Sequence, residues 1–195
     1  MEDYLELTDI VDFNNVNIQK VADELEASAE DKLDYVKLAY GYVRDQISHS
    51  ADIKAMKVTC RASEVLKDGH GICFAKANLL AALLRAKGIP AGFCYQKLIL
   101  DDETAPYLTY HGLNGVYLED IDRWIRLDAR GNKAGVQAEF SVGKEKLAFS
   151  VRKEWEEIDD FTVYPLPDVN VIQALKGNET REELWNNLPD TLEYN

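Results

Sequence analysis

Apolar residues recur along the chain at two different spacings, and the change from one to the other comes near residue 91. Before that point the spacing is helical, and it predicts helices over about 18–27, 32–47, 62–67 and 73–86. After it, apolar and polar residues alternate, which predicts strands over about 92–100, 107–118 and 124–128. Helices followed by hairpin-connected strands favour an α+β fold with an antiparallel sheet.

The two ends of the chain have weaker patterns. Residues 1–17 are predicted to form an extended or irregular arm. Beyond residue 135 the pattern predicts a hairpin over about 138–151, an extended stretch over 161–167, and helices over 169–175 and from Thr180 to Leu188. We expect a single domain over 1–195, with its core at about 30–135 and a C-terminal extension at about 136–195.

Cys73 opens the most apolar of these helices, directly after a turn that contains Gly69 and Gly71. The first turn of a helix has unpaired N–H groups and the positive end of the helix dipole. Both features lower the pKa of a thiol from its ordinary value of about 8.5. The same N–H groups could bind the oxyanion of an acyl-transfer intermediate. The alternative interpretation is a buried cysteine without a chemical role.

A cysteine nucleophile needs a base and a group that orients the base. His111, on the second predicted strand, is the best candidate for the base. Asp128, at the end of the third strand, is the best candidate for the orienting group. Because the two strands are predicted to be antiparallel neighbours, His111 and Asp128 can meet. The start of the Cys73 helix could then dock beside the imidazole.

Three sequence blocks resemble the transglutaminase-like superfamily, whose core is papain-like. The first runs from Ala62 through Cys73 to Ala91, the second begins with His111-Gly112, and the third is Trp124–Asp128. Together they cover about residues 35–135, and the specific signal is their combination in this order. We therefore identify the chain as a member of bacterial, single-domain type. It departs from the animal transglutaminases at Ile72, where those enzymes have tryptophan.

The resemblance implies a Cys–His–Asp triad at Cys73, His111 and Asp128, and acyl transfer from an amide without a cofactor or metal. An amine acceptor would give transamidation, and water would give amide or peptide hydrolysis. The superfamily also contains non-catalytic relatives, so a binding or scaffold module that retains the fold is the alternative function. The presence of all three residue types favours the enzyme.

Composition and charge limit the classes of binding partner and the cellular location that we expect. The chain is 46% hydrophobic, enough for a sizeable core, and its formal net charge is −13, which disfavours binding to nucleic acid or anionic membranes. The start of the chain lacks the basic and apolar regions of a signal peptide. Three cysteines without paired spacing agree with reduced thiols, so we expect a cytoplasmic protein. Cys60 and Cys94 are expected to be buried structural thiols. The sequence has no C-x-x-C pair, so it does not indicate a zinc site.

Two polar clusters lie outside the three blocks. His49-Ser50-Ala51-Asp52 could line a site, but a turn with local hydrogen bonds is the favoured interpretation. Arg130 and Lys133 could bind an acidic substrate, but a solvated loop is favoured.

Overall fold

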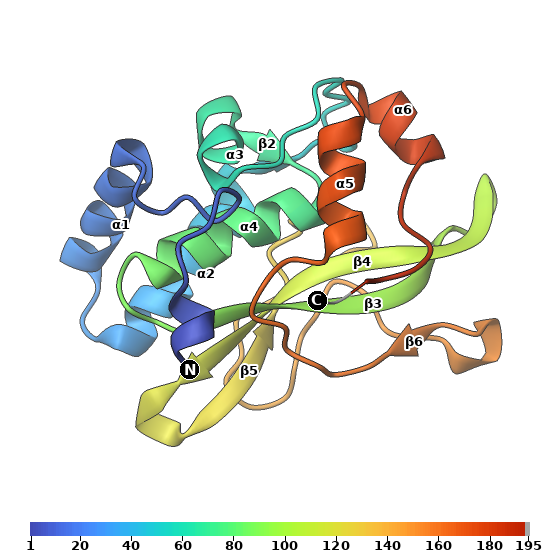
Figure 1. Ribbon diagram of the computed structural model, residues 1–195. Helices are drawn as coiled ribbons and strands as arrows, with labels where there is room; N and C mark the ends of the chain where they lie inside the picture. The colour runs from blue at the N-terminus through green and yellow to red at the C-terminus, as the bar shows by residue number, and fades with distance from the viewer. Residues whose placement is uncertain (194–195) are drawn as a thin grey trace.

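A layer of helices lies over one side of a long antiparallel hairpin in the computed structural model, which describes residues 1–193 (Figure 1). The last two residues of the predicted 1–195 domain lie outside the described part. The α-helices are α1 (Val16–Ser28), α2 (Lys32–Gln46), α3 (Ala62–Asp68), α4 (Cys73–Arg85), α5 (Val169–Gly177) and α6 (Arg181–Asn186). The strands are β1 (Ser48–His49), β2 (His70–Gly71), β3 (Ala91–Asp101), β4 (Ala105–Leu118), β5 (Arg123–Leu127) and β6 (Ile158–Asp159). Short 3₁₀ helices lie at η1 (Glu2–Leu5), η2 (Glu119–Ile121) and η3 (Lys153–Trp155).

The main sheet has the strand order β5-β4-β3-β6, and every neighbouring pair is antiparallel. β1 and β2 form a separate parallel pair of two residues each, and β2 ends just before α4 begins. The predicted α+β class with an antiparallel sheet is therefore confirmed. So are the predicted helices before residue 91 and the three strands after it, each to within about two residues at either end.

Helix α4 is the centre of the core. Every residue from Phe74 to Arg85 is buried, as expected of a helix that is apolar on nearly all sides. Its few polar groups have partners. The Tyr35 hydroxyl of α2 donates to the Leu83 carbonyl at 2.6 Å, and the Asn78 amide donates to the Cys60 carbonyl at 2.8 Å. The helix that begins at Cys73 is thus fixed on all sides.

Glycine permits a close contact between α4 and β4. A Cβ atom on Gly112 would lie 2.5 Å from Cδ1 of Phe74, a separation that real side chains do not adopt. A Cβ on Gly115 would lie 2.5 Å from a methyl group of Val163. The absence of a side chain at Gly112 lets Phe74, the residue after Cys73, pack directly on the strand that carries His111, and its absence at Gly115 makes room for Val163 of the C-terminal segment.

The N-terminal arm is tied into the molecule rather than loose. Ile10 and Val11 are buried, and η1 forms within the arm. The buried Arg85 guanidinium, at the end of α4, donates to the carbonyls of Glu6 (2.7 Å), Ala91 (2.7 and 3.1 Å) and Pro165. One side chain therefore joins the start of the chain, the sheet and the C-terminal segment.

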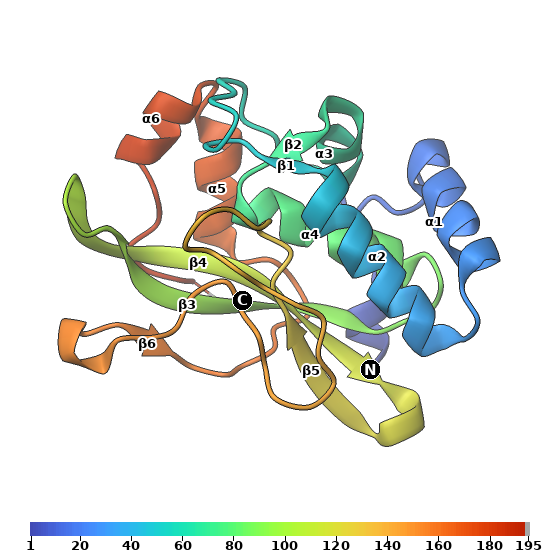
Figure 2. The same cartoon turned by 180° about the vertical axis from the view of Figure 1, so that it is seen from behind.

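The hairpin predicted over 138–151 is wrong, because this segment forms no strand. It is an irregular coil, seen in front of β4 and β5 in Figure 2. Side chains accept hydrogen bonds from backbone N–H groups that a hairpin ladder would need. The Ala138 N–H donates to Asn132 Oδ1 at 2.8 Å, and the Ala148 N–H donates to Asp128 Oδ2 at 3.0 Å. One backbone hydrogen bond, from the Glu139 N–H to the Lys146 carbonyl at 3.0 Å, crosses the segment, but no strand ladder forms.

The C-terminal helices form as predicted. Thr180 and Glu183 make the expected capping box at the start of α6, although the helix ends at Asn186 and not at Leu188. Within residues 1–193, none of the helices is both long and apolar enough to cross a bilayer.

Candidate active site

Cys73 is the first residue of α4 and is partly buried. Its N-cap residue, Ile72, has an extended backbone and makes no capping hydrogen bond with its side chain. The first-turn N–H groups therefore have no side-chain acceptor from the N-cap, and they remain available to an anion. The structure places the thiol at the helix N-terminus, as the sequence predicted.

His111 and Asp128 meet at the end of the β4–β5 ladder. The pairing ends at Asn114 and Leu127. If this register is continued by one residue, Asp128 lies opposite Leu113, which makes His111 its diagonal neighbour on the same face. The His111 Nε2 atom is 2.8 Å from Asp128 Oδ2. Nδ1 is the ring nitrogen that Asp128 leaves free, and the Cys73 sulfur is near enough to the imidazole to raise its pKa.

The electrostatics favour a charged imidazole. Burial alone would lower the pKa of His111, but the Asp128 carboxylate and the Cys73 sulfur outweigh it and raise the pKa to about 10. Burial alone would raise the pKa of Asp128. The His111 charge and two backbone N–H donors outweigh burial and keep the pKa of this carboxyl below its usual range. The arrangement places a charged imidazole beside both the buried Asp128 carboxylate and the Cys73 sulfur.

The C-terminal extension completes the site. Asp128 Oδ1 accepts from the Arg130 N–H at 3.1 Å, and Oδ2 accepts from the Ala148 N–H at 3.0 Å. The ring of Phe149 meets the His111 ring edge-on, with centroids 5.0 Å apart and an interplanar angle of 86°. Sequence reasoning missed Ala148 and Phe149. A backbone donor leaves no trace in residue type, and Phe149 lies in the segment expected to form a hairpin.

A sequence model of the transglutaminase-like superfamily matches residues 19–129, which is more than half of the chain. The chain belongs to the transglutaminase-like superfamily. None of the curated proteins matches the sequence. The superfamily match contains Cys73, His111 and Asp128 but ends before Ala148 and Phe149.

One solved structure agrees with the superfamily fold. A candidate cysteine protease from Cytophaga hutchinsonii is similar with a TM-score of 0.53 and 20% identity, over 65% of this chain and 40% of that one. The periplasmic domain of TgpA from Pseudomonas aeruginosa has a TM-score of 0.46 and 19% identity, over 65% of this chain and 46% of that one. This chain thus matches less than half the length of either structure, and at these identities the likeness concerns the fold alone.

Close to Asp128 lies a cluster of charged side chains that the sequence analysis expected in a solvated loop and a local turn. Arg130 was expected in a solvated loop, but it is buried and its guanidinium donates to both oxygens of Asp52 at 2.5 and 2.9 Å. Lys133, which is half exposed, donates to Asp52 at 3.1 Å. The segment His49–Asp52 therefore contacts the loop that follows Asp128, through an ion pair that sequence distance concealed.

His49 lies in the same cluster. It pairs in the β1–β2 ladder with Gly71, and Gly71 is two residues before Cys73. The Nδ1 atom of His49 is buried without a hydrogen-bond partner. Burial and the nearby Arg130 charge lower its pKa to about 3, so the ring is neutral at physiological pH.

The other two cysteines are structural, as predicted. Cys60 and Cys94 are buried, and burial raises the pKa of both thiols. Within residues 1–193, no group of three or more His, Cys, Asp or Glu side chains could hold a metal ion.

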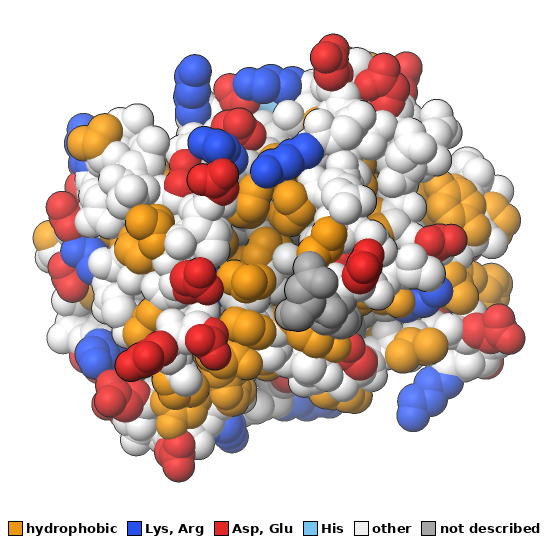
Figure 3. Space-filling model, in the orientation of Figure 1, with side chains coloured by type: hydrophobic (Ala, Val, Ile, Leu, Met, Phe, Trp, Pro, Cys, Tyr) orange, Lys and Arg blue, Asp and Glu red, His pale blue; other side chains and the backbone are white. Residues whose placement is uncertain are grey.

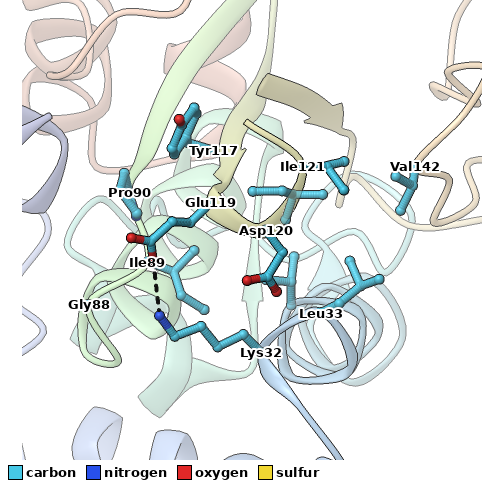
Figure 4. Close-up of a pocket in the computed structure, with 12 residues that line it drawn as sticks. Lys32, Leu33, Gly88, Ile89, Pro90, Tyr117, Glu119, Asp120, Ile121 and Val142 are labelled. Atoms are coloured by element: carbon cyan, nitrogen blue, oxygen red, sulfur yellow. Dashed lines mark hydrogen bonds and ion pairs between the residues drawn. The ribbon is translucent and has the colours of Figure 1, made fainter. Parts of the chain in front are cut away.

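Two hollows on the surface lie away from Cys73. One, of about 70 Å³, is lined by Leu33, Ile89 and Tyr117 and bordered by the Lys32–Glu119 ion pair at 3.2 Å (Figure 4). It lies past the C-terminal end of α4, about 20 Å along the helix from the thiol at 1.5 Å per residue. The other is lined by apolar residues of α5 and the N-terminal arm, on the face where apolar side chains gather in Figure 3. Neither hollow includes a triad residue.

Proposed function

We propose that this protein is a cysteine-nucleophile acyl-transfer enzyme that acts on an amide through Cys73, His111 and Asp128. The observation that carries the proposal is the 2.8 Å contact between His111 and Asp128, with the Cys73 sulfur, at the start of a buried helix, near enough to the same imidazole to raise its pKa. A nucleophile, a base and a group that orients the base, all in hydrogen-bonding reach, are the requirements of such chemistry.

The proposed reaction has two halves. The Cys73 thiolate adds to the amide carbonyl, and the oxyanion is stabilised by the Cys73 N–H and the helix N-terminus. The His111 imidazolium then gives its proton to the leaving amine, the C–N bond breaks, and a thioester remains on Cys73. In the second half the neutral imidazole takes a proton from the acceptor, which attacks the thioester and releases the thiolate. Water as acceptor gives hydrolysis, and a primary amine gives transamidation.

The sequence supports a proposal for the chemical class of the substrate and for the cellular location. We propose a peptide, protein or other amide as substrate, with no nucleic acid or membrane partner, for a protein of net charge −13. Reduced Cys60 and Cys94 suit a cytoplasmic location. We propose no cofactor, because the three side chains supply every proton transfer that the two halves need.

One observation favours the alternative, a non-catalytic binding module. His111 is only 7% exposed, which restricts the access of a substrate to the imidazole.

Acylation by p-nitrophenyl acetate separates the two functions. If the protein is an enzyme, we expect rapid release of p-nitrophenol and acetylation of Cys73, mapped by mass spectrometry. Both should be lost in Cys73→Ala and reduced in His111→Ala. Cys60→Ala is the matched control, because its thiol is buried and outside the triad. Equal acetylation in the native protein and His111→Ala would support the binding module. Adding a primary amine then decides the acceptor, since amide product above the uncatalysed level seen with Cys73→Ala appears only if transamidation occurs.

A further inference from the structure

Lys76 is a cation sealed inside the protein one helical turn from Cys73. Its exposed fraction is 0%, and it interrupts the apolar sequence of α4. Removing an ammonium group from water costs several kcal/mol unless its hydrogen bonds are replaced. Nothing in the proposed chemistry uses this side chain, so its cost calls for another explanation.

The ammonium group is held by backbone carbonyls from two distant parts of the chain. Lys76 Nζ donates to the Ile47 carbonyl at 2.5 Å and contacts the Arg44 carbonyl at 3.4 Å, both at the end of α2. It also donates to the Arg130 carbonyl at 2.9 Å, in the loop after β5. These three acceptors match the three donors of a lysine.

One residue connects this ammonium group to the proposed triad. The Arg130 carbonyl accepts from Lys76, while the Arg130 N–H donates to Asp128 Oδ1 at 3.1 Å. The next residue is Gly131, with φ of +106°, and a Cβ there would lie 3.3 Å from Lys76 Nζ. The loop therefore bends closely around the ammonium group just after it has bound Asp128.

We propose that Lys76 is a positioning residue that fixes the Asp128 loop against the helix of the nucleophile. The inference rests on the proposed function, because it assigns Lys76 to the orientation of the Cys73–His111–Asp128 group. Cys73 and Lys76 share one rigid turn of α4, so the contact with Arg130 sets where the Asp128 carboxylate lies relative to the thiol.

The surrounding charges fit this role. Asp45, Asp52 and Asp128 favour the charged ammonium, whereas Arg130 opposes it. Burial is the largest influence, and together with Arg130 it lowers the pKa of Lys76 to about 7.

The test compares Lys76→Met with the native protein by the rate of Cys73 alkylation with iodoacetamide between pH 5 and 10. Circular dichroism first establishes a temperature at which the variant is folded. We expect alkylation at pH 6 to slow by about 10- to 100-fold, as happens when a reacting group loses its orientation. The pH profile should move toward that of an ordinary thiol with a pKa of about 8.5. Lys87→Met, just past the other end of α4, is the matched control and should keep the native rate and profile.

A folded Lys76→Met protein with the native rate and pH profile would overturn the inference and reduce Lys76 to a structural role. If Lys76→Met does not fold, Lys76→Gln, which keeps an amide donor at the site, is judged by the same criteria. The proposed function fails separately. If the native protein itself is alkylated slowly at pH 6, or His111→Ala is alkylated as fast as the native protein, both proposals fall. If the native protein reacts fast and depends on His111, an unchanged Lys76→Met rate overturns only the role of Lys76.

Discussion

At the scale of single residues, His111 has the environment with the clearest measurable consequence. Its pKa is raised to about 10, against an ordinary value near 6.5, because Asp128 and the Cys73 sulfur outweigh the effect of burial. A raised pKa means that protonation stabilises the folded state. This contribution is complete below about pH 6.5 and is lost as the pH rises through about 10.

We therefore predict that the His111 ring proton titrates near pH 10 in an NMR experiment on the native protein. Cys73→Ala should lower this pKa, since it removes one of the groups that raise it. Asp128→Asn should lower it as well. A titration near pH 6.5 that neither variant moves would contradict the ion-pair arrangement.

The three side chains of the proposed triad could be named as candidates from the sequence because the proposed chemistry depends on residue type. The groups that hold these side chains in place could not be predicted. The N–H groups of Arg130 and Ala148 that hold Asp128 can come from any residue except proline. Lys76 did leave a signal, a lone lysine in an apolar helical stripe, but its acceptors are backbone carbonyls that no sequence pattern marks.

At the scale of elements, the contact of α4 with β4 brings the thiol to the imidazole. Spacing predicted both elements, and Gly112 of β4 permits the close contact between them. The coil over 138–151 was not predictable from alternation, because alternation does not reveal that Asn132 and Asp128 accept hydrogen bonds from its backbone. Ala138 and Ala148 are instead buried in a small apolar cluster with Val136.

Gly112→Ala tests the contact between the two elements. The new Cβ would lie 2.5 Å from the Phe74 ring, so α4 must shift from β4. We expect a loss of about 1–3 kcal/mol in the free energy of unfolding, the usual cost of overpacking. Alkylation of Cys73 should slow as well. Gly143→Ala is the control, because nothing lies within 4 Å of its new Cβ. Equal stability and reactivity in the two variants would show that the contact is not tight.

At the scale of the whole molecule, Arg85 joins the N-terminal arm, the sheet and the C-terminal segment through the carbonyls of Glu6, Ala91 and Pro165. The arm was predicted as irregular because it lacks periodicity. Its anchor lies about 80 residues away in sequence, at the end of α4.

We predict that Arg85→Met lowers the free energy of unfolding by on the order of 3 kcal/mol, because several buried carbonyls lose their donor. Residues 1–15 should then become sensitive to limited proteolysis before the rest of the protein. Lys20→Met, on the exposed side of α1, should change the unfolding free energy by less than about 0.5 kcal/mol. An Arg85→Met protein with the native urea midpoint and a resistant N-terminus would contradict this role.

The central claim, an activated thiolate at Cys73, is tested most directly by alkylation with iodoacetamide at about pH 6, with the modified cysteine mapped by mass spectrometry. A thiol with an ordinary pKa of about 8.5 reacts slowly at that pH. The triad predicts fast labelling of Cys73, with Cys60 and Cys94 unlabelled because they are buried, and a marked loss of rate in His111→Ala. Slow labelling of Cys73, or labelling that His111→Ala leaves unchanged, would contradict the account and favour a binding module.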